Sequence, residues 1–131
     1  MPLIYVDRSA LLLPAAASDP SDEVVEPGAG DALARLVEAG YDVVLLGSGD
    51  PPSGALPSGV KRADGLPEHL DAEAWYLTGE PYPSFGRPRG GTTVLVGPRR
   101  PVGKLPLPRF DLETRDMAAA AMEILTREAM A

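Results

Sequence analysis

The stretch Leu3-Ile4-Tyr5-Val6-Asp7-Arg8-Ser9 decides the fold, because it is a short apolar run that ends abruptly in a carboxylate. Such a run predicts a strand over residues 3–7. In α/β proteins, ligands bind outside the carboxyl ends of the parallel strands. Asp7 therefore stands where chemistry takes place in such folds, and it is the first candidate for a functional residue.

The composition is typical of a single globular domain. A chain of 131 residues has the usual length of one domain, so we expect one domain over 1–131. Its 15 Pro and 14 Gly indicate long loops between the apolar runs. The absence of Cys excludes disulfides, thiolate metal sites and a cysteine nucleophile. No signal peptide and no membrane-spanning run are recognisable, so we expect a cytoplasmic protein without membrane contact.

The charge is unevenly distributed along the chain. The formal net charge is −7, which argues against a nucleic-acid partner, because such proteins neutralise phosphates with basic residues. The segment 82–109 nevertheless contains no acidic residue, and its basic residues are Arg87, Arg89, Arg99, Arg100, Lys104 and Arg109. Two interpretations stay open for this segment: pairing with the acidic remainder of the chain, or binding of a small anion or an acidic partner.

The apolar patterns predict alternating strands and helices. We expect strands over 3–7, 41–46, 59–62, 74–77 and 92–96, helices over 31–39 and 112–130, and a short helical turn over 66–70. The last helix would be capped by Asp111 or Thr114. Residues 8–13 would form a flap or hairpin over the end of the first strand. The alternation predicts a three-layer, Rossmann-like α/β domain with a mainly parallel, five-stranded sheet.

In this sheet Asp7, Ser48 and Glu80 would lie at the carboxyl ends of strands. Asp7 could act as a nucleophile, and the hydroxyl of Ser48 could hold a phosphoryl oxygen. Lys61 could neutralise the charge that develops on the phosphoryl group, and Glu80 with Asp7 could bind Mg²⁺. The alternative is structural: the polar residues cap loops and helices, Lys61 is a surface charge, and Glu80 pairs with an arginine.

These residues resemble the motifs of the haloacid dehalogenase superfamily, in a small form without an inserted cap domain. The first family motif, an apolar strand ending in Asp-x-Asp-Gly-Thr, is similar to Val6-Asp7-Arg8-Ser9-Ala10-Leu11. The second corresponds to Leu45-Leu46-Gly47-Ser48, the third to Lys61, and the fourth, a strand ending in Gly-Asp, to Thr78-Gly79-Glu80.

The resemblance implies a parallel sheet in the order 5-4-1-2-3. It also implies Mg²⁺-dependent hydrolysis of a phosphomonoester through an aspartyl-phosphate on Asp7. Ser48 and Lys61 would bind the phosphoryl group, and Asp7, the backbone carbonyl of Ser9 and Glu80 would hold the metal. The partner would then be a small phosphorylated molecule.

The chain departs from the family pattern at four positions. Ser9 stands where family phosphatases place the acid/base aspartate, Ala10 and Leu11 replace Gly-Thr, and Glu80 replaces Asp. The loss of a general acid and base lowers rates by roughly 10²–10⁴-fold. Three hypotheses remain: a slow phosphohydrolase, a pseudoenzyme that binds or regulates a protein partner, and an unrelated α/β domain. A monomer and a homodimer both stay open.

Overall fold

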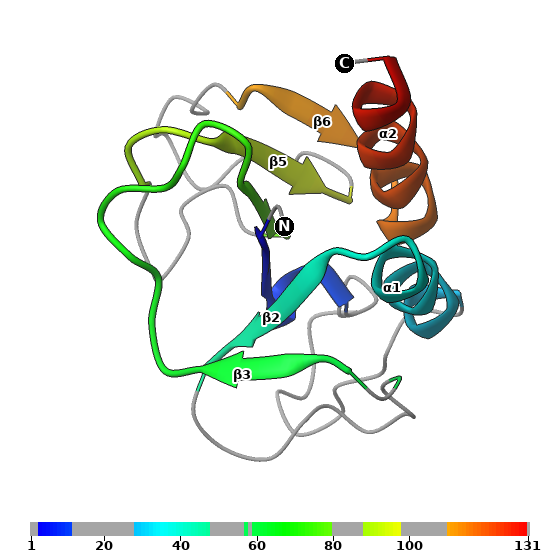
Figure 1. Cartoon of the computed structure of the whole chain (residues 1–131), viewed down its shortest axis with the longest axis horizontal. Coiled ribbons are helices and arrows are strands. Elements are labelled where there is room, and N and C mark those ends of the chain that lie inside the picture. Colours follow the sequence, from blue (N-terminus) through cyan, green and yellow to red (C-terminus); the bar gives the residue numbers. More distant parts are fainter. Residues whose placement is uncertain are drawn as a thin grey trace, which may run out of the picture.

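The computed structural model is built on one sheet of six parallel strands, in the order β3-β2-β1-β4-β5-β6 (Figure 1). It describes residues 3–11, 28–47, 57, 59–79, 88–97 and 110–130. The strands are β1 (Leu3–Asp7), β2 (Asp42–Leu46), β3 (Lys61–Ala63), β4 (Trp75–Thr78), β5 (Thr92–Val96) and β6 (Leu112–Thr114). Because all neighbours are parallel, the carboxyl ends of all six strands face the same way.

The strand β1 lies near the centre of the sheet, between β2 and β4. Its last residue, Asp7, is paired with Leu46, the last residue of β2. On the other side, Val6 is paired with Leu77 of β4. The polar end of β1 therefore lies between the carboxyl ends of β2 and β4.

Three helical segments accompany the sheet. They are the 3₁₀ turn η1 (Arg8–Leu11), which directly follows β1, and the helices α1 (Ala29–Glu38) and α2 (Met117–Met130). Both α-helices lie side by side on the same face of the sheet (Figure 1). There they bury residues such as Leu33, Leu36, Met117 and Ile124 against Ile4 and the other apolar side chains of that face. Among the described helices, none is both long and apolar enough to cross a membrane.

The opposite face of the sheet has a smaller apolar cluster, formed by Leu46, Leu70, Ala74 and Tyr76. In the described residues it is covered by the segment 64–74, which connects β3 to β4. This connection returns across the sheet in the direction opposite to that of the β1–α1–β2 unit. A right-handed crossover in the reverse direction must pass over the other face, which accounts for its position.

The fold class predicted from the sequence is confirmed, including the neighbour order of the five expected strands. The alternation of Trp75 and Tyr76 places them on opposite faces of the sheet, and both are buried. The second helical layer of a three-layer domain is not seen in the described residues, since both α-helices cover one face. The assignment of a single domain stays a prediction.

Four local predictions were wrong. Leu112–Thr114 form a sixth strand, so the last helix begins only at Met117. Neither Asp111 nor Thr114 caps it; the carboxylate of Asp116 accepts a hydrogen bond from the amide of Ala119 at 2.7 Å. The segment 66–70 is not helical, because it pairs with residues 88–90 through a parallel bridge between His69 and Arg89. In the described part of 8–13, η1 replaces the expected flap or hairpin.

Candidate functional site at the carboxyl edge of the sheet

Asp7 is a buried carboxylate at the carboxyl edge of the sheet, the edge at which the strands end. Its exposed fraction is 5%. Its Oδ1 accepts a hydrogen bond from the backbone amide of Ser9 at 3.2 Å. Its Oδ2 accepts two, from the hydroxyl of Thr78 at 3.2 Å and from that of Tyr76 at 3.4 Å. Both carboxylate oxygens are therefore held by donors of the chain itself.

The alternation of side chains along two neighbouring strands brings these groups together. Trp75 and Leu77 of β4 face the helices, so Tyr76 and Thr78 face the opposite side of the sheet. Asp7 faces that side too, because Ile4 and Val6 of β1 point toward the helices. Since β1 and β4 are neighbours, both hydroxyls lie on the strand next to the carboxylate.

A second contact connects the turn after β1 to the end of β4. The amide of Gly79 donates a hydrogen bond to Oγ of Ser9 at 2.9 Å. A side chain at position 79 would collide with the backbone carbonyl of Ser9, so the two segments approach closely only because residue 79 is Gly. The hydroxyl of Ser9 therefore takes part in joining the two strand ends.

The structure does not bring Lys61 to Asp7. The ammonium of Lys61 lies 3.3 Å from Oδ1 of Asp42, the first residue of β2, at the amino edge of the sheet. Asp7 pairs with Leu46 at the other end of that strand, roughly 13 Å away at a rise of about 3.3 Å per residue. A role of Lys61 at the phosphoryl group stays a prediction, and it requires the side chain to leave Asp42.

The neighbouring cation, Arg62, points to the carboxyl edge instead. Its Nη2 donates a hydrogen bond of 3.4 Å to the carbonyl of Gly47, the residue that follows β2. Arg62 and Lys61 are successive residues of a strand, so their side chains leave on opposite faces. Arg62 was not singled out from the sequence.

Ser48 and Glu80, the two other predicted site residues, lie outside the described residues. In the described part of the chain, no group of three His, Cys, Asp or Glu side chains could hold a metal ion. Asp7 and the carbonyl of Ser9 are hard oxygen donors, the kind that Mg²⁺ prefers. Magnesium therefore fits these two donors in kind, and the role of Glu80 as a further ligand stays a prediction.

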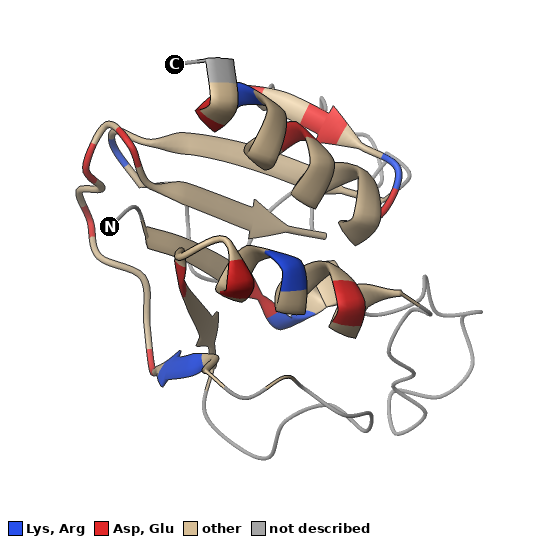
Figure 2. Cartoon of the chain, turned by 45° about the vertical axis from the view of Figure 1, so that its right-hand side comes forward, with Lys and Arg blue, Asp and Glu red and all other residues tan. Residues whose placement is uncertain are grey.

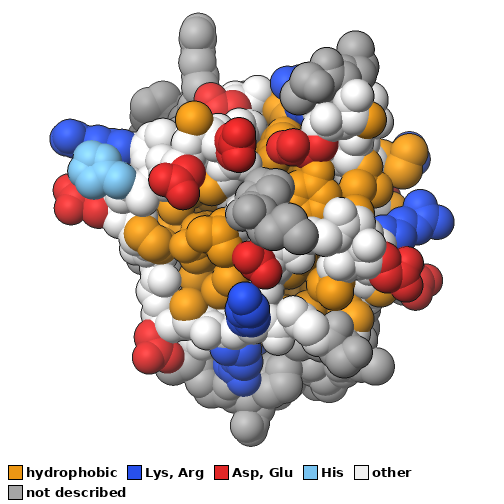
Figure 3. Space-filling model, viewed as in Figure 1, with side chains coloured by type: hydrophobic (Ala, Val, Ile, Leu, Met, Phe, Trp, Pro, Cys, Tyr) orange, Lys and Arg blue, Asp and Glu red, His pale blue; other side chains and the backbone are white. Residues whose placement is uncertain are grey.

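Within the sheet, most charged residues lie on the two edge strands, β3 and β6. Figure 2 shows β3 in blue and red on β6, whereas the strands between them are mostly tan. Figure 3 shows the molecule from the same direction as Figure 1, and hydrophobic side chains are visible between the charged ones on this face. Asp7 is a charged residue buried within a largely apolar sheet, which makes it the candidate functional residue.

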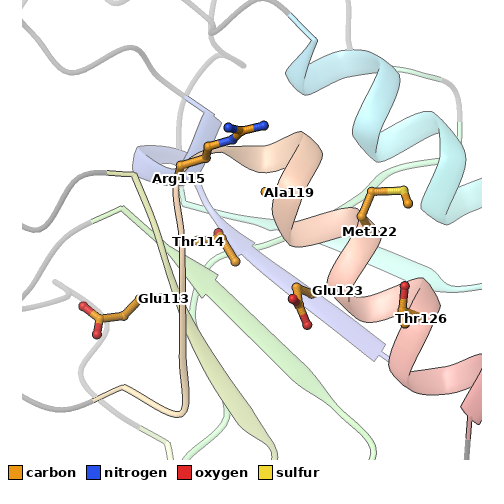
Figure 4. Close-up of a pocket in the computed structure, with 7 residues that line it drawn as sticks. All are labelled: Glu113, Thr114, Arg115, Ala119, Met122, Glu123 and Thr126. Atoms are coloured by element: carbon orange, nitrogen blue, oxygen red, sulfur yellow. The ribbon is translucent and has the colours of Figure 1, made fainter.

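A groove of about 530 Å³ lies at the far edge of the sheet, three strands from β1 (Figure 4). Residues of β6, of the turn after it and of α2 line it: Glu113, Thr114, Arg115, Ala119, Met122, Glu123 and Thr126. It contains none of the predicted site residues, so we do not assign the groove to the site around Asp7.

Tyr76 was not assigned to the site from the sequence, and Thr78 and Gly79 were quoted there only as the residues that precede Glu80 in the fourth motif. A signal for the two hydroxyls was present in the sequence. In the predicted order, the strand 74–77 is next to the strand 3–7, and polar groups at alternate positions of its end share one face. The collision that only Gly79 avoids depends on the approach of two backbones, which no local pattern reveals.

No protein-family model and no curated protein matches this chain. Its structure is similar to that of a D,D-heptose 1,7-bisphosphate phosphatase from B. bronchiseptica, which was crystallised with magnesium and phosphate. The TM-score is 0.61 over 97% of this chain and 99% of the other, at 17% sequence identity. The likeness shows that the two proteins share a fold, and it agrees with the fold that the resemblance to the haloacid dehalogenase superfamily implied.

Proposed function

We propose that this chain is a slow phosphohydrolase that transfers the phosphoryl group of a small phosphomonoester to Asp7. The observation that carries the proposal is the buried carboxylate at the end of the central strand, oriented by three hydrogen bonds. A carboxylate held in one orientation can act as a nucleophile without first being ordered. The shared fold with a phosphatase supports the same reaction class.

The reaction would proceed in two displacements at phosphorus. A carboxylate oxygen of Asp7 forms a bond to phosphorus while the ester P–O bond breaks, and the leaving alkoxide takes a proton from water. The hydroxide left by that water, or a second water molecule, then attacks phosphorus. The bond to Asp7 breaks, inorganic phosphate leaves, and the carboxylate is regenerated. The net reaction consumes one water and yields an alcohol and phosphate.

The remaining predicted residues would bind and orient the phosphoryl group. Ser48 would donate a hydrogen bond to one of its oxygens, and a cation, Lys61 or Arg62, would balance its charge. Asp7, the carbonyl of Ser9 and Glu80 would hold Mg²⁺. When bound, Mg²⁺ would supply charge neutralisation at the phosphoryl oxygens.

Slow turnover follows from the chemistry of Ser9. A hydroxyl cannot protonate a leaving alkoxide or activate water as a carboxylic acid can, and this help is worth roughly 10²–10⁴-fold in rate. The Oγ of Ser9 also accepts the hydrogen bond of the Gly79 amide. We therefore assign Ser9 to positioning the turn and, through its carbonyl, to the metal.

The proposal is tested by release of phosphate from p-nitrophenyl phosphate in the presence of Mg²⁺. We expect Asp7→Asn to release at least 10²-fold less phosphate than the unchanged protein. Glu38→Gln is the matched control, because it removes an exposed carboxylate at the end of α1 and should leave the rate unchanged. Equal rates for the unchanged protein and Asp7→Asn would contradict an Asp7 nucleophile.

The engagement of Ser9 by Gly79 favours a second function, that of a pseudoenzyme. With Ser9 in place of a carboxylic acid, such a domain would bind a phosphorylated ligand or a protein partner without turnover. Isothermal titration with inorganic phosphate separates the two functions. Phosphate binding that depends on the residues around Asp7, together with phosphate release no faster than that of Asp7→Asn, would favour the pseudoenzyme.

A further inference from the structure

The two oxygens of Asp7 have different surroundings. Oδ2 accepts hydrogen bonds from two hydroxyls, those of Thr78 and Tyr76. Among the described residues, Oδ1 accepts one, from the backbone amide of Ser9 in the turn η1. The two oxygens are therefore not equivalent in the folded protein.

The hydroxyl donors are themselves deeply buried. Thr78 and Tyr76 both have exposed fractions of 0%. A buried hydroxyl is costly unless it is hydrogen-bonded, and a bond to a charged acceptor is among the strongest of such bonds. Because β4 is a central strand paired on both sides, neither backbone can move without breaking the sheet. The position of Oδ2 is thereby determined by the rigid part of the fold.

We propose that Thr78 and Tyr76 are positioning residues that hold Oδ2 of Asp7, so that Oδ1 is the oxygen that bonds to phosphorus. This inference rests on the proposed function. In the first displacement, Oδ1 forms the new bond as the ester P–O bond breaks, and Oδ2 becomes the acyl oxygen. That oxygen keeps both hydroxyl donors, so the side chain does not rotate during the reaction.

Isosteric substitutions test this arrangement without changing the packing. Thr78→Val and Tyr76→Phe each remove one hydroxyl, and Thr78→Ser keeps it. Thr93→Val is the matched control, because Thr93 is a buried threonine of the adjacent strand β5, with an exposed fraction of 3%, and is not a partner of Asp7. We expect Thr78→Val and Tyr76→Phe to lower kcat about tenfold with KM changed less than twofold. Thr78→Ser and Thr93→Val should retain kcat.

A second measurement does not depend on turnover. Fluoroberyllate forms a bond to a carboxylate oxygen in the geometry of an acyl phosphate, and its binding with Mg²⁺ can be followed by ¹⁹F NMR. We expect Thr78→Val to weaken this binding about tenfold and Thr78→Ser to preserve it. If the unchanged protein does not hydrolyse phosphomonoesters but shows this pattern, the hydrolase proposal fails while the inference stands.

Two results would overturn the inference. One is a Thr78→Val protein that equals Thr93→Val in kcat and in fluoroberyllate binding. The other is a rise in KM at constant kcat, since this indicates that the hydroxyls contribute to substrate binding rather than to the orientation of Asp7. Urea denaturation of each variant verifies that the folded state is populated during both measurements.

Discussion

A carboxylate lies at each end of the parallel strands: Asp7 is buried at the carboxyl edge, and Asp42 is exposed at the amino edge. At the carboxyl edge, the carboxylate of Asp7 has an exposed fraction of 5% and accepts three hydrogen bonds from described residues. At the amino edge, Lys61 and Asp42 form a pair whose side chains are 66% and 40% exposed. Removing one partner of a buried hydrogen bond lowers the free energy of unfolding strongly, whereas an exposed ion pair contributes little to it. Burial therefore distinguishes the candidate functional edge from the other edge better than charge does.

The largest expected effect is a gain of activity at the carboxyl edge. Ser9→Asp would place a carboxylic acid beside Asp7, at the position where the resemblance implies an acid/base residue. If general acid/base help limits the rate, phosphate release should rise by roughly 10²–10⁴-fold. Initial rates with p-nitrophenyl phosphate measure this, and Ser9→Asn, which cannot transfer a proton, is the control. An equal rise in both variants would exclude an acid/base explanation.

The next effect concerns the close approach of β4 to the turn after β1. Gly79→Ala places a methyl group against the carbonyl of Ser9, which is backbone and cannot turn aside. Overpacking of this kind costs about 1–3 kcal/mol of the free energy of unfolding. Urea denaturation measures the loss. Gly65→Ala is the control, because a Cβ at Gly65 meets nothing within 4 Å; equal stabilities of the two variants would contradict the steric argument.

A smaller effect is expected at the amino edge at high pH. Burial, with a contribution from the charge of Glu128, raises the pKa of Tyr41 above its ordinary value of about 10. The stability associated with the neutral phenol is complete below about pH 10, and it is lost as the pH rises through the raised folded pKa, because the unfolded chain ionises first. Urea midpoints of the unchanged protein and Tyr41→Phe at pH 8 and pH 11 test this. We expect the variant to lose less stability between them.

The smallest effect is expected for the exposed pair of the amino edge. Lys61→Ala should change the free energy of unfolding by less than about 1 kcal/mol, as is usual for exposed ion pairs.

Phosphate binding distinguishes the two candidate cations, Lys61 and Arg62. Arg62→Ala should weaken binding of inorganic phosphate more than Lys61→Ala does, because the guanidinium lies at the carboxyl edge. The reverse order would return the role to Lys61.

Most of the sheet could be predicted because its strands are continuous apolar runs. β2 and β5 illustrate this, since four of the five residues in each are buried. The strand β6 was missed because it has only three residues, and Glu113 interrupts its apolar character. As an edge strand it is determined by its pairing with β5, for which a local pattern contains no information.

The site was predictable at Asp7 and not around it. A carboxylate after an apolar strand is a local feature, so the sequence reveals it. Its partners Tyr76 and Thr78 belong to a strand far along the chain, and their hydroxyls matter only through the neighbour order of the sheet. Lys61 is the opposite case. Its position in the sequence matched the third family motif, but its side chain extends toward Asp42.

The hydrogen bond from Thr78 to Asp7 joins residues that are 71 positions apart in the chain. During synthesis, a nascent chain that ends after β3 already contains Asp7 but neither of its hydroxyl donors. The carboxylate acquires its final surroundings only when β4 enters the sheet beside β1, a non-local pairing of the kind that slows folding. The candidate site is therefore assembled late, and fragments that end before Tyr76 would lack both hydroxyl donors of Asp7.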